Sequence, residues 1–289
     1  MPLTALMIVM CTMMSGQPVG PARDDSAAEK LGWKLSVQAW TFRDRTAFEA
    51  IDAAHALGLK YMEFYPGQSL SPDQRDAKVG PDLTAAQRDA FRARLAAGGI
   101  RAMNFGVVNF SNDEAAARKV FEFAKDMGLQ TITCEPADTA AWNVVEKLSN
   151  GFKINAACHN HPKPSHYWNP DTVFEAIKGR SPRIGCCADT GHWPRSGLNP
   201  VECLKKYQGH IICLHFKDIA KGEDRPWGTG DGDAAGMLRE LHRQGFKGVI
   251  SIEYETGSGK ELEANCAKCV AFFDKTAAEI AAVPAPTKK

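Results

Sequence analysis

Short apolar runs alternate with longer segments of helical periodicity along most of this chain. The runs contain β-branched, aromatic and small residues and are bounded by turn signals, which is typical of buried parallel strands. They cover residues 35–40, 60–65, 100–108, 131–134, 153–158, 183–188, 210–216 and 248–254. Eight is the number of strands that closes a (β/α)8 barrel.

The segments between these runs carry helix signals, and three of them end at glycine, a common residue just after a helix. The predicted helices cover residues 46–57, 84–97, 113–127, 139–149, 170–178, 200–207, 234–244 and 260–280. No composition shift divides the chain, so the sequence predicts an α/β fold, a single-domain (β/α)8 TIM barrel over residues 33–281. An open doubly wound sheet is the alternative, but no G-x-G-x-x-G sequence follows the first predicted strand.

The two ends of the chain differ from this pattern. Residues 3–14 are apolar and have the length of a signal peptide, although no Lys or Arg precedes them, and they are too short to span a bilayer. We expect residues 1–32 to be a signal peptide and linker and the protein to be periplasmic or secreted; without a signal it would be cytoplasmic. We expect no stable membrane association after processing. Residues 282–289 are expected to form a flexible tail.

Charge and cysteine content exclude some functions. The 289 residues carry a formal net charge of +1, whereas nucleic-acid binders usually show a basic excess. The nine cysteines are an odd number in a chain too long to need disulfides. We expect them to be small buried hydrophobic residues. This includes Cys266 and Cys269, a C-x-x-C pair within a predicted helix that has no second pair to complete a zinc site.

Chemically active side chains gather where the predicted strands end. Because the carboxyl ends of barrel strands meet at one mouth, residues far apart in sequence become neighbours there. These strand-end residues are Trp40, Glu63, Asn104, Glu135, His159, His161, Asp189, His192, His215, Lys217, Glu253 and Glu255. Carboxylates mixed with imidazoles are ligands for Mn²⁺, Co²⁺, Zn²⁺ or Fe²⁺, so this mouth is predicted to hold a catalytic divalent metal.

Three segments carry a family resemblance: residues 189–192 (DTGH), 214–218 (LHFKD) and 251–255 (SIEYE). In this order and spacing they resemble the xylose isomerase-like TIM-barrel superfamily of sugar isomerases and epimerases, a grouping that also contains metal-dependent apurinic endonucleases. The resemblance covers roughly residues 33–278 and is strongest from Thr131 onward.

The resemblance implies a metal site, because ketose 3-epimerases of this grouping hold a divalent metal with Glu, Asp, His and Glu from four successive strands. Asp189, His215 and Glu253 match the last three, whereas the fifth strand ends in His159 and not in Glu. Either His159 is the fourth ligand, or Glu135 reaches in from the strand before. We favour Glu135, since three carboxylates balance a divalent cation better than two, and Mn²⁺ is the ion expected first.

The resemblance also implies the chemistry. In the epimerases the fifth- and eighth-strand Glu residues form an acid/base pair beside the substrate carbon. Here His159 or His161 would take one role and Glu253 the other, since the unperturbed imidazole of histidine titrates near neutral pH. The expected activity is that of a sugar isomerase or epimerase, or of a 3-keto-glycoside lyase, acting by proton transfer next to a metal-polarised carbonyl.

Further residues are predicted to contact the sugar. Aromatic faces can pack on the C–H surface of a sugar ring, the second member of the D-x-x-H pair is expected to bind substrate or a second metal, and an Arg follows the seventh strand as in the epimerases. The predicted substrate-binding residues are Trp40, Glu63, His192, Trp193, Lys217 and Arg225. Lys217 has a second interpretation, a local ion pair with Asp218 that supports His215.

Two other functions fit the same resemblance. One is an apurinic-endonuclease-like phosphodiesterase, which the near-zero net charge disfavours, as does the presence of Glu63 and Asn104 where a trinuclear zinc site needs histidines. The other is a sugar-binding barrel without catalysis. We expect a small sugar or keto-glycoside as the partner and no nucleic acid, and the sequence leaves homo-oligomers open.

Overall fold

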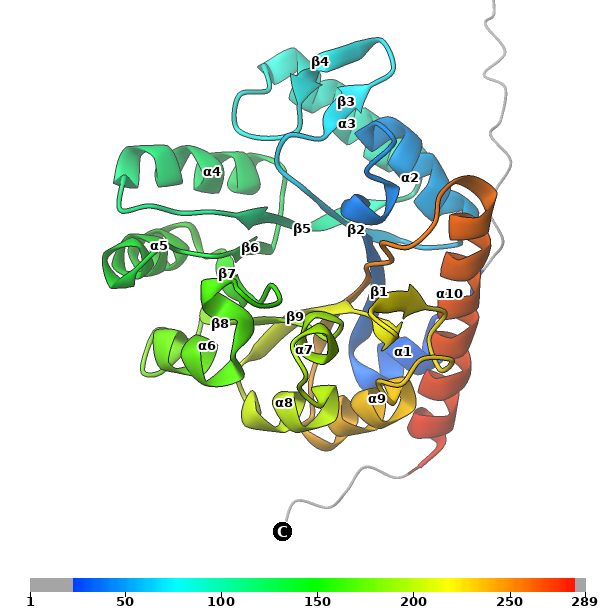
Figure 1. Ribbon diagram of the computed structural model, residues 1–289. Coiled ribbons are helices and arrows are strands. Elements are labelled where there is room, and N and C mark those ends of the chain that lie inside the picture. Colours follow the sequence, from blue (N-terminus) through cyan, green and yellow to red (C-terminus); the bar gives the residue numbers. More distant parts are fainter. Residues whose placement is uncertain (1–22, 284–289) are drawn as a thin grey trace, which may run out of the picture.

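Eight parallel strands close into a barrel in this computed structural model, which describes residues 23–283 (Figure 1). Neighbours around the barrel follow chain order, and the last strand pairs with the first in parallel. The strands are β1 (Trp33–Gln38), β2 (Tyr61–Phe64), β5 (Arg101–Val108), β6 (Thr131–Cys134), β7 (Asn155–His159), β8 (Ile184–Asp189), β9 (Ile211–Phe216) and β12 (Gly248–Ile252). The predicted (β/α)8 fold and its eight strands are confirmed.

Helices surround the barrel and connect its strands (Figure 1). They are α2 (Ala47–Ala56), α3 (Ala85–Ala97), α4 (Glu114–Asp126), α5 (Thr139–Phe152), α6 (Pro170–Ile177), α8 (Pro200–Lys206), α9 (Ala234–Arg243) and α10 (Gly259–Ala282). Short elements follow several strands: η1 (Ala39–Phe42), the hairpin β3 (Ser69–Ser71) with β4 (Gln74–Lys78), η2 (His166–Trp168), α7 (His192–Arg195), and the hairpin β10 (Asp218–Ala220) with β11 (Glu223–Arg225). Thr46 and Thr84 form capping boxes that fix the starts of α2 and α3.

The structure differs from the prediction before the first strand, where a linker was expected. Helix α1 (Ser26–Leu31) lies there and packs against α10. The Arg23 guanidinium pairs with Asp274 at 2.6 Å, and Lys30 Nζ donates to the carbonyl oxygen of Ala281 at 2.6 Å. The predicted signal segment, residues 1–22, and residues 284–289 of the predicted tail lie outside the described residues. Within residues 23–283, no helix is long and apolar enough to cross a membrane.

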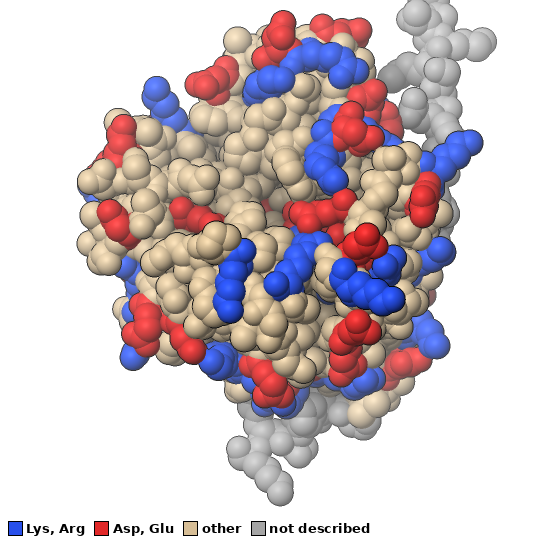
Figure 2. Space-filling view, in the orientation of Figure 1, with Lys and Arg blue, Asp and Glu red and all other residues tan. Residues whose placement is uncertain are grey.

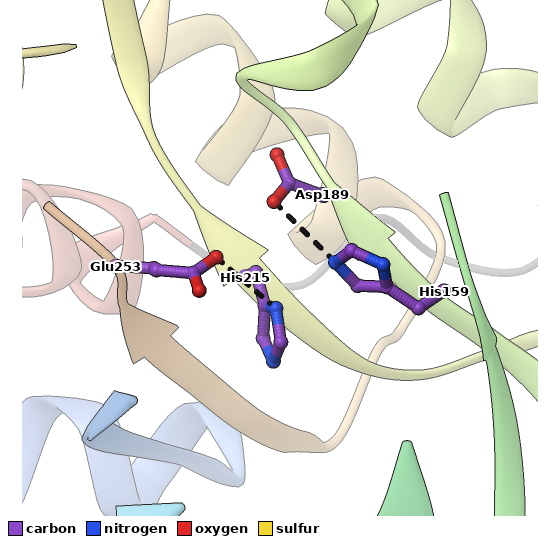
Figure 3. A group of neighbouring side chains, drawn as sticks. All are labelled: His159, Asp189, His215 and Glu253. Carbon is purple, nitrogen blue, oxygen red and sulfur yellow. Dashed lines mark ion pairs between the residues drawn. The ribbon is translucent and has the colours of Figure 1, made fainter. Parts of the chain in front are cut away.

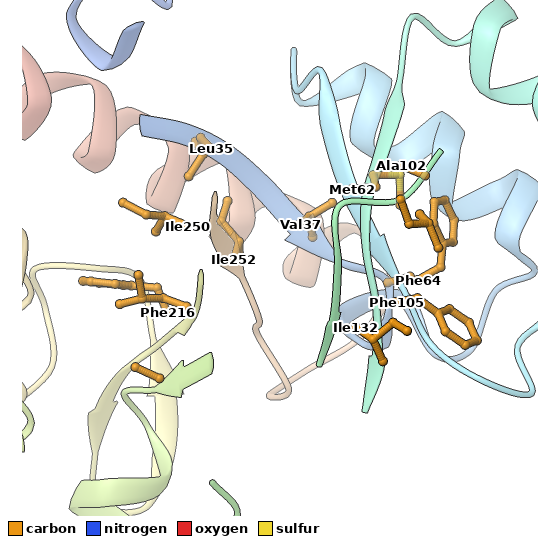
Figure 4. Packing of buried hydrophobic residues seen from close by; sticks show 14 of the residues in the cluster. Leu35, Val37, Met62, Phe64, Ala102, Phe105, Ile132, Phe216, Ile250 and Ile252 are labelled. Atoms are coloured by element: carbon orange, nitrogen blue, oxygen red, sulfur yellow. The ribbon is translucent and has the colours of Figure 1, made fainter. Parts of the chain in front are cut away.

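The alternation of strand residues decides which side chains enter the barrel. On β12, Ile250 and Ile252 belong to the large core between strands and helices (Figure 4). Val249 belongs instead to a small cluster inside the barrel. Ser251 and Glu253 follow Val249 at intervals of two, so they also lie on the inner side. The same alternation on the other strands sends the predicted site residues inward. The eight cysteines within the described residues are all buried and none forms a disulfide, as predicted.

Candidate active site

Four buried side chains from four successive strands meet at the mouth of the barrel (Figure 3). His159 ends β7, Asp189 ends β8, His215 lies near the end of β9 and Glu253 directly follows β12. Each offers one ligand atom, and these atoms all lie within 4.8 Å of one another. We call these four residues the metal cluster.

The donor atoms of the metal cluster fit a divalent cation. Nε2 of His159 and both ring nitrogens of His215 are buried and make no hydrogen bond of good geometry, although carboxylate oxygens lie 3.1–3.5 Å from them. Such a buried polar atom costs about 1–3 kcal/mol when it stays unsatisfied. Two ligands with bonds of about 2.0–2.2 Å lie up to about 4.4 Å apart, so only small side-chain shifts would bring the four atoms onto one ion. A mixed imidazole and carboxylate set suits Mn²⁺, Fe²⁺, Co²⁺ or Zn²⁺.

Local hydrogen bonds aim Asp189 at the cluster. Its Oδ1 accepts from the backbone N–H groups of Gly191 and His192 at 2.9 and 3.0 Å, which leaves Oδ2 facing His159 Nε2 at 3.5 Å. The Asn160 side chain accepts from the Asp189 N–H at 2.9 Å and donates to the Asp189 carbonyl oxygen at 3.0 Å. Asn160 therefore fixes the end of β8 against the end of β7.

Lys217 lies within the metal cluster, fully buried. Its Nζ is 2.7 Å from Asp189 Oδ2, 2.7 Å from Glu253 Oε2 and 3.6 Å from Glu255 Oε1. Burial opposes its charge, but these carboxylates raise the pKa of Lys217. Burial likewise opposes the charges of Asp189 and Glu253, whose pKa values are nevertheless lowered by nearby cations, Lys217 among them. Lys217, predicted to contact the sugar, is absent from the lining of the pocket above the metal cluster and pairs with these carboxylates.

Glu135 lies behind His159, on the side away from the rest of the metal cluster. Its Oε1 accepts from Nδ1 of His159 at 3.0 Å and from Nδ1 of His161. Although burial opposes ionisation, these two imidazoles lower the pKa of Glu135 to about 2. Glu135 belongs to a second group with His159 and His161. The geometry thus favours His159 as the fourth member of the cluster, because Glu135 reaches only the outer nitrogen of that ring.

Glu63 holds a corresponding position behind His215. It is fully buried, its Oε1 accepts from the Thr133 hydroxyl at 2.6 Å, and its Oε2 accepts from Nδ2 of Asn104 at 3.2 Å. Nε2 of His215 lies 3.1 Å from Glu63 and Nδ1 lies 3.2 Å from Glu253. Glu63 does not line the pocket. Glu63 was predicted to contact substrate; it lies inside β2, below the mouth, with its carboxylate against His215.

A cavity of about 370 Å³ opens above the metal cluster. Its walls combine residues predicted from the sequence with others that no sequence motif marks. The lining residues are Gln38, Trp40, Tyr65, Pro66, Gly106, Val107, Asn109, His159, His161, His192, Glu253 and Glu255. Trp40 is 41% exposed, and Tyr65 meets it edge-on with ring centroids 5.0 Å apart. Figure 2 shows acidic side chains near the middle of one face of the molecule with basic side chains beside them.

Arg195 connects two residues of this pocket. Its guanidinium donates to Nδ1 of His192 at 3.2 Å and to Glu255 at 3.0 Å, and it pairs with buried Asp224 at 3.1 Å. Burial, reinforced by the nearby charge of Lys217 and opposed by Asp189, lowers the pKa of His192 to about 2. Because Arg195 occupies Nδ1 of His192, Nε2 is the ring nitrogen that faces the cluster, 3.4 Å from Oδ2 of Asp189. No motif marked Arg195 in the sequence.

Two predicted sugar-binding residues lie elsewhere. Trp193 is fully buried in the core and packs against Tyr207 with ring centroids 5.5 Å apart. Arg225 belongs to the β10–β11 hairpin and pairs with Glu223 at 2.9 Å. Neither lines the pocket. The turn of α7 points Trp193 toward the core, whereas on β11 it is Asp224, the neighbour of Arg225, that reaches Arg195 and Glu255.

Comparisons with known proteins agree with this architecture. The family model described as xylose isomerase-like TIM barrel matches residues 51–276. A crystal structure of an uncharacterized protein from Parabacteroides distasonis ATCC 8503 is 33% identical, covers 84% of this chain and 99% of its own, and superposes with a TM-score of 0.70. None of the curated proteins compared matches the chain.

Two more distant structures share the fold alone. D-psicose 3-epimerase from Clostridium cellulolyticum H10, solved with D-tagatose, is 12% identical with a TM-score of 0.66 over 85% of this chain and 99% of its own. The IolI protein, solved with a zinc atom, is 18% identical with a TM-score of 0.62 over 86% of this chain and 98% of its own.

Proposed function

Because the chain belongs to the xylose isomerase-like TIM barrel family, we propose that its metal cluster holds a divalent ion and that it is a sugar isomerase, epimerase or lyase. The observation that supports this most is that buried imidazole nitrogens of His159 and His215, which make no hydrogen bond of good geometry, converge with carboxylates at the floor of a pocket. Metals of this type polarise a carbonyl oxygen when bound, which acidifies the adjacent C–H bond. We propose Mn²⁺ as the first ion to test.

His161 is the base that this geometry favours. Its Nδ1 donates to Glu135, so Nε2 is left as the acceptor, and the residue lines the pocket. The Glu135 carboxylate would stabilise the imidazolium that forms when Nε2 takes a proton from the substrate carbon. Glu253 lines the same pocket as a carboxylate and could act as a second base, whereas the proton that returns to the substrate comes from the His161 imidazolium. His159 is then a ligand held in place by Glu135.

Proton abstraction next to a carbonyl is common to isomerisation, epimerisation and β-elimination, so one experiment covers all three. The protein is incubated in D₂O with ketoses and 3-keto-glycosides, after chelation or with added Mn²⁺ or Co²⁺. NMR should show exchange of one carbon-bound proton only in the metal-loaded samples. Turnover that continues unchanged in excess chelator would contradict the proposal.

Matched variants test the residues. Asp189→Asn should abolish exchange, because it weakens a ligand, whereas Asp73→Asn on the exposed β3–β4 hairpin should leave the rate unchanged. His161→Gln should reduce the exchange rate by about 10²–10⁴-fold while retaining the metal, as expected for loss of a general base. Equal rates for His161→Gln and the unmodified protein would assign the base elsewhere.

A further inference from the structure

Two further cavities adjoin the active-site pocket, and together they form what we call the side groove. The first, of about 350 Å³, shares Asn109 with the pocket and is lined by Asn109, Phe110, Ser111, Glu135, Pro136, Ala137, His166 and Tyr167. The second, of about 510 Å³, shares Ala137, His166 and Tyr167 with the first and extends between α5 and α6. Shared lining residues make these spaces neighbours along the barrel mouth.

The first cavity of the side groove combines an apolar floor with polar edges. Phe110, Pro136 and Tyr167 are buried, whereas Ser111 and His166 are exposed. The floor is held in place, since the Tyr167 hydroxyl donates to the Pro136 carbonyl oxygen at 2.5 Å and accepts from the Trp142 indole N–H at 2.9 Å. A rigid apolar surface with hydroxyl, imidazole and amide groups around it suits a sugar ring.

The charged residues that line the pocket and the first cavity indicate which class of ligand can bind. Among the described residues, no Lys or Arg lines the active-site pocket or the first cavity, whereas Glu135, Glu253 and Glu255 do. Phosphate recognition relies on cationic side chains or helix N-termini. A phosphorylated sugar would therefore meet carboxylates without a cationic partner in the lining of either space.

From this geometry, and resting on the proposed function, we propose that the substrate is an uncharged glycoside of at least two sugar rings. The ring that reacts lies over the metal cluster, and the ring linked to it lies in the first cavity of the side groove. The pocket alone is near the lower end of the volumes that small-molecule sites show, about 300–1,000 Å³, whereas the groove extends it along one side.

The test compares 3-keto-cellobiose and 3-keto-maltose with 3-keto-glucose, and fructose 6-phosphate with fructose, on the Mn²⁺-loaded protein. We expect kcat/KM to be about tenfold higher or more for a keto-disaccharide than for 3-keto-glucose, and lower for the phosphorylated ketose than for fructose. Ala137→Trp would fill the groove and lower the disaccharide-to-monosaccharide ratio about tenfold. Ala140→Trp, at an exposed position on α5 outside these cavities, should leave the ratio unchanged.

Equal kcat/KM values for one and two rings, together with an unaffected Ala137→Trp ratio, would overturn the inference and leave the proposed function standing. A preference for the phosphorylated ketose would also overturn it. A binding measurement keeps the test independent of turnover: saturation-transfer NMR should show both rings of cellobiose or maltose in contact with the protein, and Ala137→Trp should remove the contact of one ring. Contact through a single ring in the unmodified protein would contradict the inference even if no sugar is turned over.

Discussion

Nζ of Lys217 lies 2.7 Å from Oδ2 of Asp189, with no solvent exposure on either side chain. The same ammonium group lies 2.7 Å from Glu253, so one internal cation is shared by two carboxylates of the metal cluster. An incoming divalent ion meets this positive charge at close range, where the low polarity of the interior strengthens electrostatic repulsion. The positive charge of Lys217 thus weakens metal binding at this cluster.

Lys217→Met should therefore bind Mn²⁺ more tightly, by about tenfold or more, which corresponds to about 1.4 kcal/mol. Isothermal titration calorimetry of chelator-treated protein measures the change. The metal-free variant should be less stable by about 3–5 kcal/mol, because its carboxylates are left uncompensated, and added metal should restore much of that loss. Lys206→Met on α8, which removes an exposed ion pair with Asp171, is the matched control. Weaker Mn²⁺ binding by Lys217→Met would assign the lysine a supporting role.

The positions of His159 and Glu135 predict unequal effects on metal content. His159→Ala removes a ligand and should leave the purified protein without stoichiometric metal. Glu135→Ala removes the carboxylate that orients His159 and should weaken binding by about 10–100-fold without abolishing it. Elemental analysis and calorimetry on both variants, with exposed Glu122→Ala as control, distinguish the two roles. Complete metal loss only in Glu135→Ala would reverse the assignment.

The pattern of strands and helices in the sequence predicted both the barrel and the gathering of several site residues at its mouth. Apolar runs of strand length, separated by capped helices, define a closed parallel barrel, and closure brings Asp189, His215 and Glu253 to one mouth whatever the loops do. Periodicity of two also places Lys217 on the same side of the chain as His215. The family resemblance added the expected order of metal ligands along the chain.

The features that the sequence did not predict depend on how deep a side chain lies in the barrel and on packing between distant parts of the chain. Glu63 was expected at the mouth, yet it precedes the last residue of β2 and therefore points one layer below. The side-chain directions of Trp193 and Arg225 follow from short elements after the strands, whose geometry no period predicts. Helix α1 is held by α10, with Lys30 bonded to Ala281 across 251 residues of sequence, so its local sequence resembled a linker.

The protonation of the cluster imidazoles makes metal binding depend on pH. Burial disfavours the charged rings, but Glu63 and Glu253 raise the pKa of His215, and Asp189, with a second carboxylate, raises that of His159. A histidine whose pKa is raised on folding stabilises the metal-free protein. This contribution is complete at pH values below the unfolded pKa of about 6.5, and it is lost as the pH rises through the pKa of the folded state. Metal binding requires neutral nitrogens and so opposes protonation.

Mn²⁺ affinity should consequently rise between pH 6 and pH 8, and binding should release protons. The gain in melting temperature on adding Mn²⁺ should grow over the same range. Calorimetry in two buffers with different ionisation enthalpies counts the protons released. An affinity that stays constant from pH 6 to pH 8, with no proton release, would show that the two imidazoles are already neutral in the metal-free protein.

Asn160 offers a test of the scaffold that is separate from the ligands. Asn160→Ala would leave the buried N–H and carbonyl oxygen of Asp189 without the two hydrogen bonds that they now make with one side chain. Each lost partner costs about 1–3 kcal/mol, so we expect the free energy of unfolding in urea to fall by about 2–4 kcal/mol. Exposed Asn112→Ala should change it by less than about 0.5 kcal/mol. Because Asn160 positions Asp189, the variant should also bind Mn²⁺ more weakly; unchanged stability and affinity would mean that α7 alone fixes this carboxylate.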